Sequence, residues 1–172
     1  MATVIRFARG TTIAAILIAA LGLAGCASTP EGPDANASAA GVAAPGSAQD
    51  FVVNVGDRVF FETDSSEVTA QGRETLDKQA QWLTNYAQYA FTVEGHADER
   101  GTREYNIALG ARRATTARNF LAQNGVNGAR IRTISYGKER PVAVCNDISC
   151  WSQNRRAQTV LNARTGTVAV GN

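Results

Sequence analysis

Large apolar side chains are almost absent between Ala27 and Asp50, and this gap separates the part of the chain that can fold from the part that cannot. The segment consists mainly of Ala, Gly, Ser and Pro. Such a composition buries too little surface to offset the entropy lost on ordering. We therefore expect a flexible tether at residues 26–50, a single domain at residues 51–165 and a tail at residues 166–172.

The first 25 residues have the features of a leader that directs export. Arg6 and Arg9 precede an uncharged stretch, residues 11–24, which is short for a membrane span of about 20 apolar residues. Small residues then lead to Cys26 in the order Leu-Ala-Gly-Cys, which resembles the lipobox of bacterial lipoproteins. The resemblance implies that residues 1–25 are a signal peptide and that Cys26 carries lipid after cleavage. An ordinary signal peptide beside a cysteine is the alternative.

The charge balance argues against a nucleic-acid-binding protein. The chain has 17 basic and 15 acidic side chains, and loss of Arg6 and Arg9 with the leader leaves 15 of each sign. A general nucleic-acid binder needs a basic excess that neutralises phosphates. We therefore expect no nucleic-acid partner.

Two further cysteines, Cys145 and Cys150, lie in a short polar segment. Export places them in an oxidising compartment, where neighbouring cysteines pair. We expect a local disulfide, with two free thiols as the alternative. The sequence indicates no metal site and no cofactor, because no other Cys or His pair lies near them and His96 is the only histidine.

After residue 51 the hydrophobic pattern alternates between the period of a strand and that of a helix. Strands are expected at 57–61, 90–94, 131–136 and 156–162, with the first reaching back toward Phe51. Helices are expected at 69–89, with Thr69 as the N-cap, and at 103–123. This order predicts an α+β fold of the βαβαββ type, with right-handed crossovers and both helices on one face of a mixed sheet.

Each predicted helix has an apolar face. The inward residues are expected to be Leu76, Ala80, Leu83 and Ala87 in the first helix and Ile107, Ala111, Ala114 and Leu121 in the second. On the strand between the helices, Phe91 and Val93 point to one side. The many alanines of the second helix indicate close packing on the sheet.

The densest polar segment, residues 94–106, follows the second strand and leads into the second helix. Another polar segment, residues 62–66, follows the first strand. The crevice beyond the carboxyl ends of strands is where α/β sheets usually bind ligands. Both segments are therefore expected at the same end of the sheet, where they form a binding site.

Five stretches of the chain resemble the OmpA-like peptidoglycan-binding domain. They are residues 61–66, 94–106, 108–114, 135–141 and 154–156, and the resemblance covers about residues 55–161. Within that family the chain is most similar to lipid-anchored members that belong to the Tol–Pal envelope system. The resemblance implies that the protein binds peptidoglycan and exchanges between the cell wall and TolB, with other Tol proteins as further partners.

The resemblance also implies recognition of meso-diaminopimelate in the peptidoglycan stem peptide, whose free end carries an ammonium and a carboxylate. By the family pattern, Asp98 receives the ammonium and Arg113 takes the carboxylate, which suits the fork of a guanidinium. Asp64 resembles an additional acidic contact. Further binding candidates are Ser65, His96, Arg100, Asn106 and Leu109. The chain departs from the family pattern at Glu62 and Thr63, where Asp and an aromatic residue are usual, so weaker apolar contact is expected there.

The sequence thus predicts a non-enzymatic tether. Lipid on Cys26 would hold it in the outer membrane, with the domain in the periplasm bound noncovalently to the cell wall. Ala27 agrees with this placement, because it lacks the Asp that marks inner-membrane retention. The alternatives are a pure protein-interaction module, a structural ion pair between Asp98 and Arg113, and a wall hydrolase that would use Glu94 and Asp98 as its carboxylates.

Overall fold

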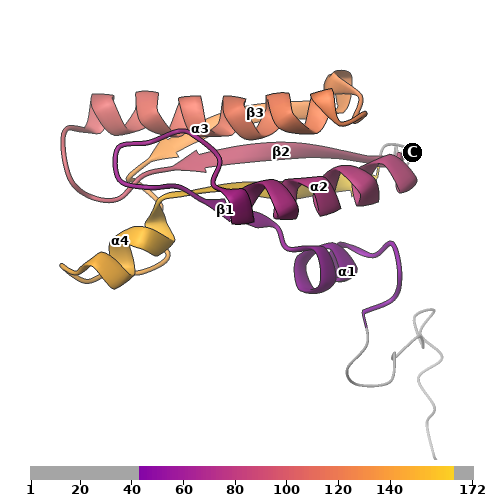
Figure 1. Ribbon diagram of the computed structural model, residues 1–172, viewed down its shortest axis with the longest axis horizontal. Coiled ribbons are helices and arrows are strands. Elements are labelled where there is room, and N and C mark those ends of the chain that lie inside the picture. The colour runs from indigo at the N-terminus through magenta and orange to yellow at the C-terminus, as the bar shows by residue number, and fades with distance from the viewer. Residues whose placement is uncertain (1–42, 165–172) are drawn as a thin grey trace, which may run out of the picture. The chain divides into compact units, whose positions relative to one another are not determined.

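The computed structural model describes residues 43–164, which hold a four-stranded sheet and its helices (Figure 1). In chain order the elements are α1 (Ala48–Asp50), η1 (Phe51–Val55), β1 (Arg58–Phe60), α2 (Ala70–Asn85), β2 (Tyr89–His96), α3 (Arg103–Gln123), η2 (Gly128–Arg130), β3 (Ile131–Gly137), α4 (Ile148–Asn154) and β4 (Arg156–Arg164). The predicted signal peptide, Cys26, most of the tether and the tail lie outside the described residues, so these assignments stay predictions.

The strands form one mixed sheet in the order β1-β4-β2-β3. The neighbours β2 and β3 are parallel and are joined through α3, whereas β4 is antiparallel to both β1 and β2. The predicted α+β fold with a mixed sheet is therefore confirmed. Because β1, β2 and β3 run in one direction, their carboxyl ends lie at one end of the sheet. The polar segments that follow β1 and β2 meet there, as the sequence predicted.

One face of the sheet carries both long helices. Val59, Ala157 and Gly95 are register partners on β1, β4 and β2, so their Cβ positions form one row on this face. A Cβ atom on Gly72 of α2 would lie 3.8 Å from Val59, and one on Gly95 would meet α3. Figure 1 shows α2 and α3 beside each other along the strands. The core between them and the sheet includes Phe51, Val59, Phe61, Leu76, Leu83, Phe91, Val93 and Leu121.

The helix α3 approaches β2 through two glycines. A Cβ atom on Gly95 would lie 1.8 Å from the carbonyl oxygen of Gly110, and one on Gly110 would lie 2.4 Å from the hydroxyl oxygen of Ser135. Only a residue without a side chain leaves room for such a contact. The Ser135 hydroxyl also donates to the carbonyl of Ile107 at 2.7 Å. These contacts set the distance of α3 from the sheet and thereby place its first turns beside the strand ends.

Packed structure begins earlier than the predicted boundary at residue 51. Gly46 is buried, and its carbonyl accepts a hydrogen bond from the Tyr89 hydroxyl at 2.9 Å. The Asp50 carboxylate accepts one from the Trp82 indole at 2.8 Å. The next five residues form the helical turn η1, so the prediction of a strand reaching back toward Phe51 is wrong. Tertiary packing overrides local β propensity here, because the fully buried Phe51 ring packs against Trp82.

The helix α2 starts as predicted but ends earlier. The Thr69 hydroxyl accepts a hydrogen bond from the Gly72 N–H at 3.1 Å, which confirms the N-cap. The helix ends at Asn85 rather than near residue 89, because the chain must turn into β2. Ala87 is therefore exposed in the turn, and its predicted inward position is wrong.

The helix α3 has the predicted bounds and a different buried face. Ala114 and Leu121 are buried as expected, and Ile107 is half-buried. Ala111 is exposed, so its inward assignment is wrong. Its place is taken by polar residues, because the first half of α3 buries Asn106 and Arg113 against the loops at the end of the sheet.

Residues 141–155 contain α4, a helix that the sequence analysis did not predict. A disulfide joins Cys145 to Cys150, with the two Cα atoms 5.7 Å apart, so the predicted pairing is confirmed. At the end of α4, the Asn154 side chain accepts a hydrogen bond from the Val142 N–H at 2.8 Å. The disulfide near the start of α4 and the Asn154 bond at its end therefore both tie the helix to the residues that precede it.

Candidate functional site

Six of the predicted binding residues line one hollow of about 260 Å³ at the end of the sheet. They are Asp64, Asp98, Arg100, Asn106, Leu109 and Arg113. The lining is completed by Thr63, Gly101 and Tyr105, so it comes from the loops after β1 and β2 and from the first turns of α3. The predicted acid and the predicted base therefore share one hollow.

The carboxylate of Asp98 already has cationic partners. Arg100 donates from Nε to Oδ1 at 3.1 Å and from Nη2 to Oδ2 at 2.7 Å, while Arg155 Nη1 lies 3.4 Å from Oδ2. Burial by itself would raise the pKa of Asp98, but the hydrogen bonds from Arg100, supported by Arg155, lower it below the ordinary value. Asp98 is therefore ionised at neutral pH.

Arg113 is fully buried and is held by backbone carbonyls of the loop after β1 and of the last residue of β2. Its Nε donates to the carbonyl of Ser65 at 2.8 Å and its Nη1 to that of His96 at 2.8 Å. Its Nη2 donates to the carbonyl of Glu62 at 3.2 Å. A guanidinium has five N–H donors, so two remain for a ligand. Burial, with a contribution from Arg155, lowers the pKa of Arg113 to about 10, which keeps it protonated at neutral pH.

Ser65 and His96 hold Arg113 through their carbonyls, and neither side chain lines the hollow. The Ser65 hydroxyl accepts a hydrogen bond from the Glu67 N–H at 3.0 Å. The His96 ring is buried beside Tyr136, with 5.6 Å between the ring centroids. The structure therefore gives both residues a supporting place, and direct contact with a ligand stays a prediction for them.

The His96 imidazole is neutral in the folded protein. Burial lowers its pKa to about 4, and the positive charges of Arg156, Arg140 and Arg58 contribute in the same direction. The Glu94 carboxylate is the nearest acid, with Oε2 at 3.6 Å from Nε2. The buried ring is therefore compatible with the folded state only when the imidazole is uncharged.

Asp64 is the one non-glycine residue with a positive φ, +57°, within the described part of the chain. Its carboxylate accepts a hydrogen bond from the Tyr105 hydroxyl, and this bond is the main reason that the pKa of Tyr105 is raised. Tyr105 lines the hollow, and the sequence analysis gave it no role. Its position one helical turn before Leu109 was the signal that could have indicated it.

The loop between β2 and α3 is held by side chains from outside it. The Asn106 amide donates to the carbonyl of Arg100 at 2.7 Å. Lys138 Nζ donates to the carbonyls of Glu99 at 3.1 Å and Gly101 at 2.7 Å. Three consecutive carbonyls of the loop are thus bonded, so its backbone is fixed independently of what its side chains contact.

Trp151 of α4 is a second residue beside the site that the sequence analysis did not place. The Arg100 guanidinium lies over its ring, with Cζ at 4.3 Å from the centroid. The Trp151 indole N–H donates to the Glu99 carboxylate. The disulfide closed by the preceding residue, Cys150, anchors this tryptophan. The outer side of the hollow therefore depends on α4.

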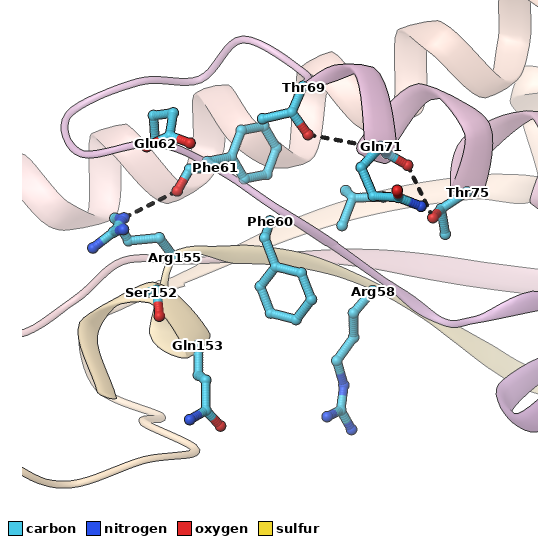
Figure 2. A pocket seen from close by; sticks show the side chains of 12 residues that line it. Arg58, Phe60, Phe61, Glu62, Thr69, Gln71, Thr75, Ser152, Gln153 and Arg155 are labelled. Carbon is cyan, nitrogen blue, oxygen red and sulfur yellow. Dashed lines mark hydrogen bonds between the residues drawn. The ribbon is translucent and has the colours of Figure 1, made fainter. Parts of the chain in front are cut away.

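A larger hollow of about 720 Å³ opens along β1, between the start of α2 and α4 (Figure 2). Phe60 and Gln153 are among its lining side chains, and none of the predicted binding residues lines it. Arg155 links the two hollows, because it lines the larger one and also approaches Asp98. We take the smaller hollow as the candidate site, since the opposite charges that suit a zwitterion gather there.

Two further findings concern residues 43–164. Within them, no group of three or more His, Cys, Asp or Glu side chains is arranged to hold a metal ion. In the same residues, no helix combines the length and the apolar character needed to cross a membrane.

The sequence and fold match those of known proteins. The OmpA family matches residues 60–156. The peptidoglycan-associated lipoprotein of Mesorhizobium japonicum is 66% identical over 149 residues, which cover 85% of this chain and 89% of the relative. That of Rhizobium meliloti is 64% identical over 148 residues, which cover 84% of each chain. The crystal structure of the peptidoglycan-associated lipoprotein from Burkholderia pseudomallei has a TM-score of 0.60 and 42% identity, covering 62% of this chain and 90% of that one.

The family match runs from the end of β1 to the start of β4, so it includes every residue that lines the candidate hollow. The relatives named here are peptidoglycan-associated lipoproteins, and this family match confirms the prediction of a non-enzymatic protein. The chain belongs to the OmpA family, among its peptidoglycan-associated lipoproteins.

Proposed function

We propose that the domain binds the stem peptide of peptidoglycan by holding both charges of meso-diaminopimelate between Asp98 and Arg113. The observation that carries this proposal is the presence of an ionised carboxylate and a protonated guanidinium in one small hollow. The free end of diaminopimelate carries an ammonium and a carboxylate on one carbon atom. A complementary site needs an acid and a base a few ångströms apart, and relatives named as peptidoglycan-associated support this choice of ligand.

In this proposal Asp98 receives the ammonium and the two remaining donors of Arg113 bind the carboxylate. Charge-assisted hydrogen bonds of this kind are about twice as strong as neutral ones. Arg113 is already fixed by three carbonyls, so it loses little conformational freedom when the ligand binds. Asp64 and Tyr105 add polar contacts from the opposite loop and from α3, and Leu109 offers apolar contact to the methylene chain of the ligand.

The proposal for the whole protein is a tether of the cell envelope. Lipid on Cys26 anchors it in the outer membrane, and the domain lies in the periplasm at the end of a flexible segment. The lipobox and the relatives named as lipoproteins support this arrangement. As part of the Tol–Pal system, the domain exchanges between the wall and TolB, through surfaces that overlap at the hollow.

Co-sedimentation with isolated cell wall tests the binding proposal. Mature protein in detergent is mixed with wall, sedimented and quantified, with and without free meso-diaminopimelate as competitor. Asp98→Asn is expected to weaken binding at least about 30-fold, because it removes the carboxylate assigned to the ligand ammonium. Arg103→Ala is the control, since Arg103 begins α3, the helix that carries Arg113, and pairs with Glu139 outside the hollow.

Sedimentation of Asp98→Asn at the wild-type level would show that the assigned acid is wrong. Release of soluble fragments from the wall would point instead to a hydrolase. The structure gives that alternative no support, because Glu94, the second carboxylate it would need, contacts His96 and does not line the hollow. Loss of wall binding together with unchanged TolB binding would separate the two partners.

A further inference from the structure

We infer that the hollow is closed by its own cation: Arg100 occupies the place of the ligand ammonium on Asp98, and Trp151 is the positioning residue that holds it there. This inference rests on the proposed function, because it concerns the same hollow. It adds an internal competitor to the site and gives a role to α4, a helix outside the predicted binding loops.

The contact of Arg100 with Asp98 engages both carboxylate oxygens, at 3.1 Å and 2.7 Å. A ligand ammonium needs the same oxygens. The other partner, Arg155, has a side chain only 6% exposed and is also bonded to the carbonyl of Phe61, so it stays in place. The side chain of Arg100 is 40% exposed. Arg100 is therefore the cation that a ligand displaces.

Arg100 also spans the hollow. Its backbone belongs to the loop after β2, and its Nη2 lies 3.5 Å from the hydroxyl of Thr63 in the loop after β1. The bonds from Asn106 and Lys138 to the carbonyls of its loop do not involve the Arg100 side chain. Opening the hollow therefore needs only a side-chain rotation, with the backbone left in place.

Trp151 holds the closed position from outside. A planar guanidinium over an indole ring is the favoured form of a cation–π contact, and here Cζ lies 4.3 Å from the ring centroid. The indole is itself fixed by its bond to Glu99 and by the disulfide at Cys150. The ring therefore keeps Arg100 on Asp98 without touching the carboxylate.

Ligand binding then exchanges one cation for another at Asp98. A ligand without an ammonium cannot replace Arg100, because it would leave a largely buried carboxylate with less compensation. The closed hollow therefore selects zwitterions over simple carboxylates. It also keeps the Asp98 carboxylate compensated while the domain is free of the wall.

The test is calorimetric binding of a soluble stem tripeptide that ends in meso-diaminopimelate. Arg100→Ala is expected to bind about fivefold tighter than wild type, the upper range for loss of an ion pair whose cation is partly exposed. Trp151→Ala should change affinity in the same direction by about twofold, whereas Trp151→Phe keeps an aromatic face and stays near wild type. Arg103→Ala is again the control. Carbon-13 NMR should show a higher pKa for Asp98 in Arg100→Ala.

Weaker binding by Arg100→Ala, with Asp98→Asn also weakened, would make Arg100 a direct ligand contact and overturn the inference while the proposed function stands. Wild-type binding by Asp98→Asn would overturn the proposed function itself. Equal tightening by Trp151→Phe and Trp151→Ala would show that the aromatic ring does not hold the arginine. An unchanged Asp98 pKa in Arg100→Ala would contradict the closed pair in solution.

Discussion

Two arginines face the candidate hollow, and they are held in opposite ways. Arg113, on what we call the inner wall, is fully buried and bonded to three backbone carbonyls. Arg100 forms the outer wall with Trp151, has a partly exposed side chain and is bonded mainly to one carboxylate. Moving Arg113 would break one buried and two part-buried bonds to carbonyls, whereas an ion pair with a partly exposed cation separates at smaller cost. The inner wall is therefore a fixed frame and the outer wall is replaceable.

This difference lets one hollow be rigid and selective at once. The fixed guanidinium offers its two remaining donors without reorganisation. The replaceable guanidinium keeps Asp98 compensated until another cation arrives. If the division is correct, changes on the inner wall lower the stability of the whole domain, while changes on the outer wall act locally.

The largest effect is expected from Arg113→Met, which keeps the aliphatic stem and removes all three bonds to carbonyls. Loss of the buried bond to the His96 carbonyl costs about 1–3 kcal/mol, and each of the two part-buried bonds adds about 0.5–1.5 kcal/mol. The free energy of unfolding should therefore fall by roughly 2–6 kcal/mol. Urea denaturation measures this. The neighbouring Arg112→Met is the matched control, because Arg112 is exposed, and it should change stability by less than about 0.5 kcal/mol. Equal effects of the two variants would break the comparison.

The next effect is a loss of stability on mild acidification, caused by His96 behind the inner wall. Its pKa is about 4 in the folded protein and 6.5 in an unfolded chain, so the unfolded state binds the extra proton between these values. Stability is complete above pH 6.5 and falls as the pH drops toward 4, by roughly 3 kcal/mol. His96→Phe, which cannot titrate, should give a flat profile over that range. A wild-type profile that is already flat would contradict the buried neutral ring.

Protonation of Asp98 lowers stability at a lower pH than protonation of His96, and it does so through the outer wall. The pKa of Asp98 is below the ordinary value of 3.8, so its contribution is present above that pH and is lost only as the pH falls further. Thermal melts of the wild type and of His96→Phe therefore separate the two walls. The stabilities of the two proteins should change differently between pH 6.5 and 4, and both should fall in parallel below pH 4.

Much of the fold could be predicted from the sequence because its signals are local. The N-cap of α2, the bounds of α3 and the apolar pair Phe91 and Val93 depend on spacing within one element. The order of strands and helices brought the loops that carry Asp64 and Asp98 to one end of the sheet. The shared hollow with Arg113 came from the family resemblance, since a buried arginine has no signature in a hydrophobic pattern.

The parts that could not be predicted depend on contacts between distant residues. Trp151 reaches Glu99 across 52 positions, and its place follows from α4, which lies in a segment without hydrophobic periodicity. Ala111 was expected inside and Arg113 was not placed in the core, because small apolar residues are buried far more often than arginine. The carbonyls that hold Arg113 inside belong to the loop after β1 and to the end of β2, and only the folded chain brings them together.

The smallest effect on stability is expected from removing the disulfide with Cys145→Ser and Cys150→Ser together. Loop-closure entropy for so short a loop amounts to about 2 kcal/mol at most. Hydrogen exchange should show faster exchange for the amides of α4, because the disulfide and Asn154 close that segment on itself. The amides of α3 around Arg113 should keep their protection, since none of the carbonyls that hold this arginine belongs to α4. If α3 lost protection to the same extent, the two walls would be one cooperative unit, and the separation of fixed frame from replaceable side would have to be abandoned.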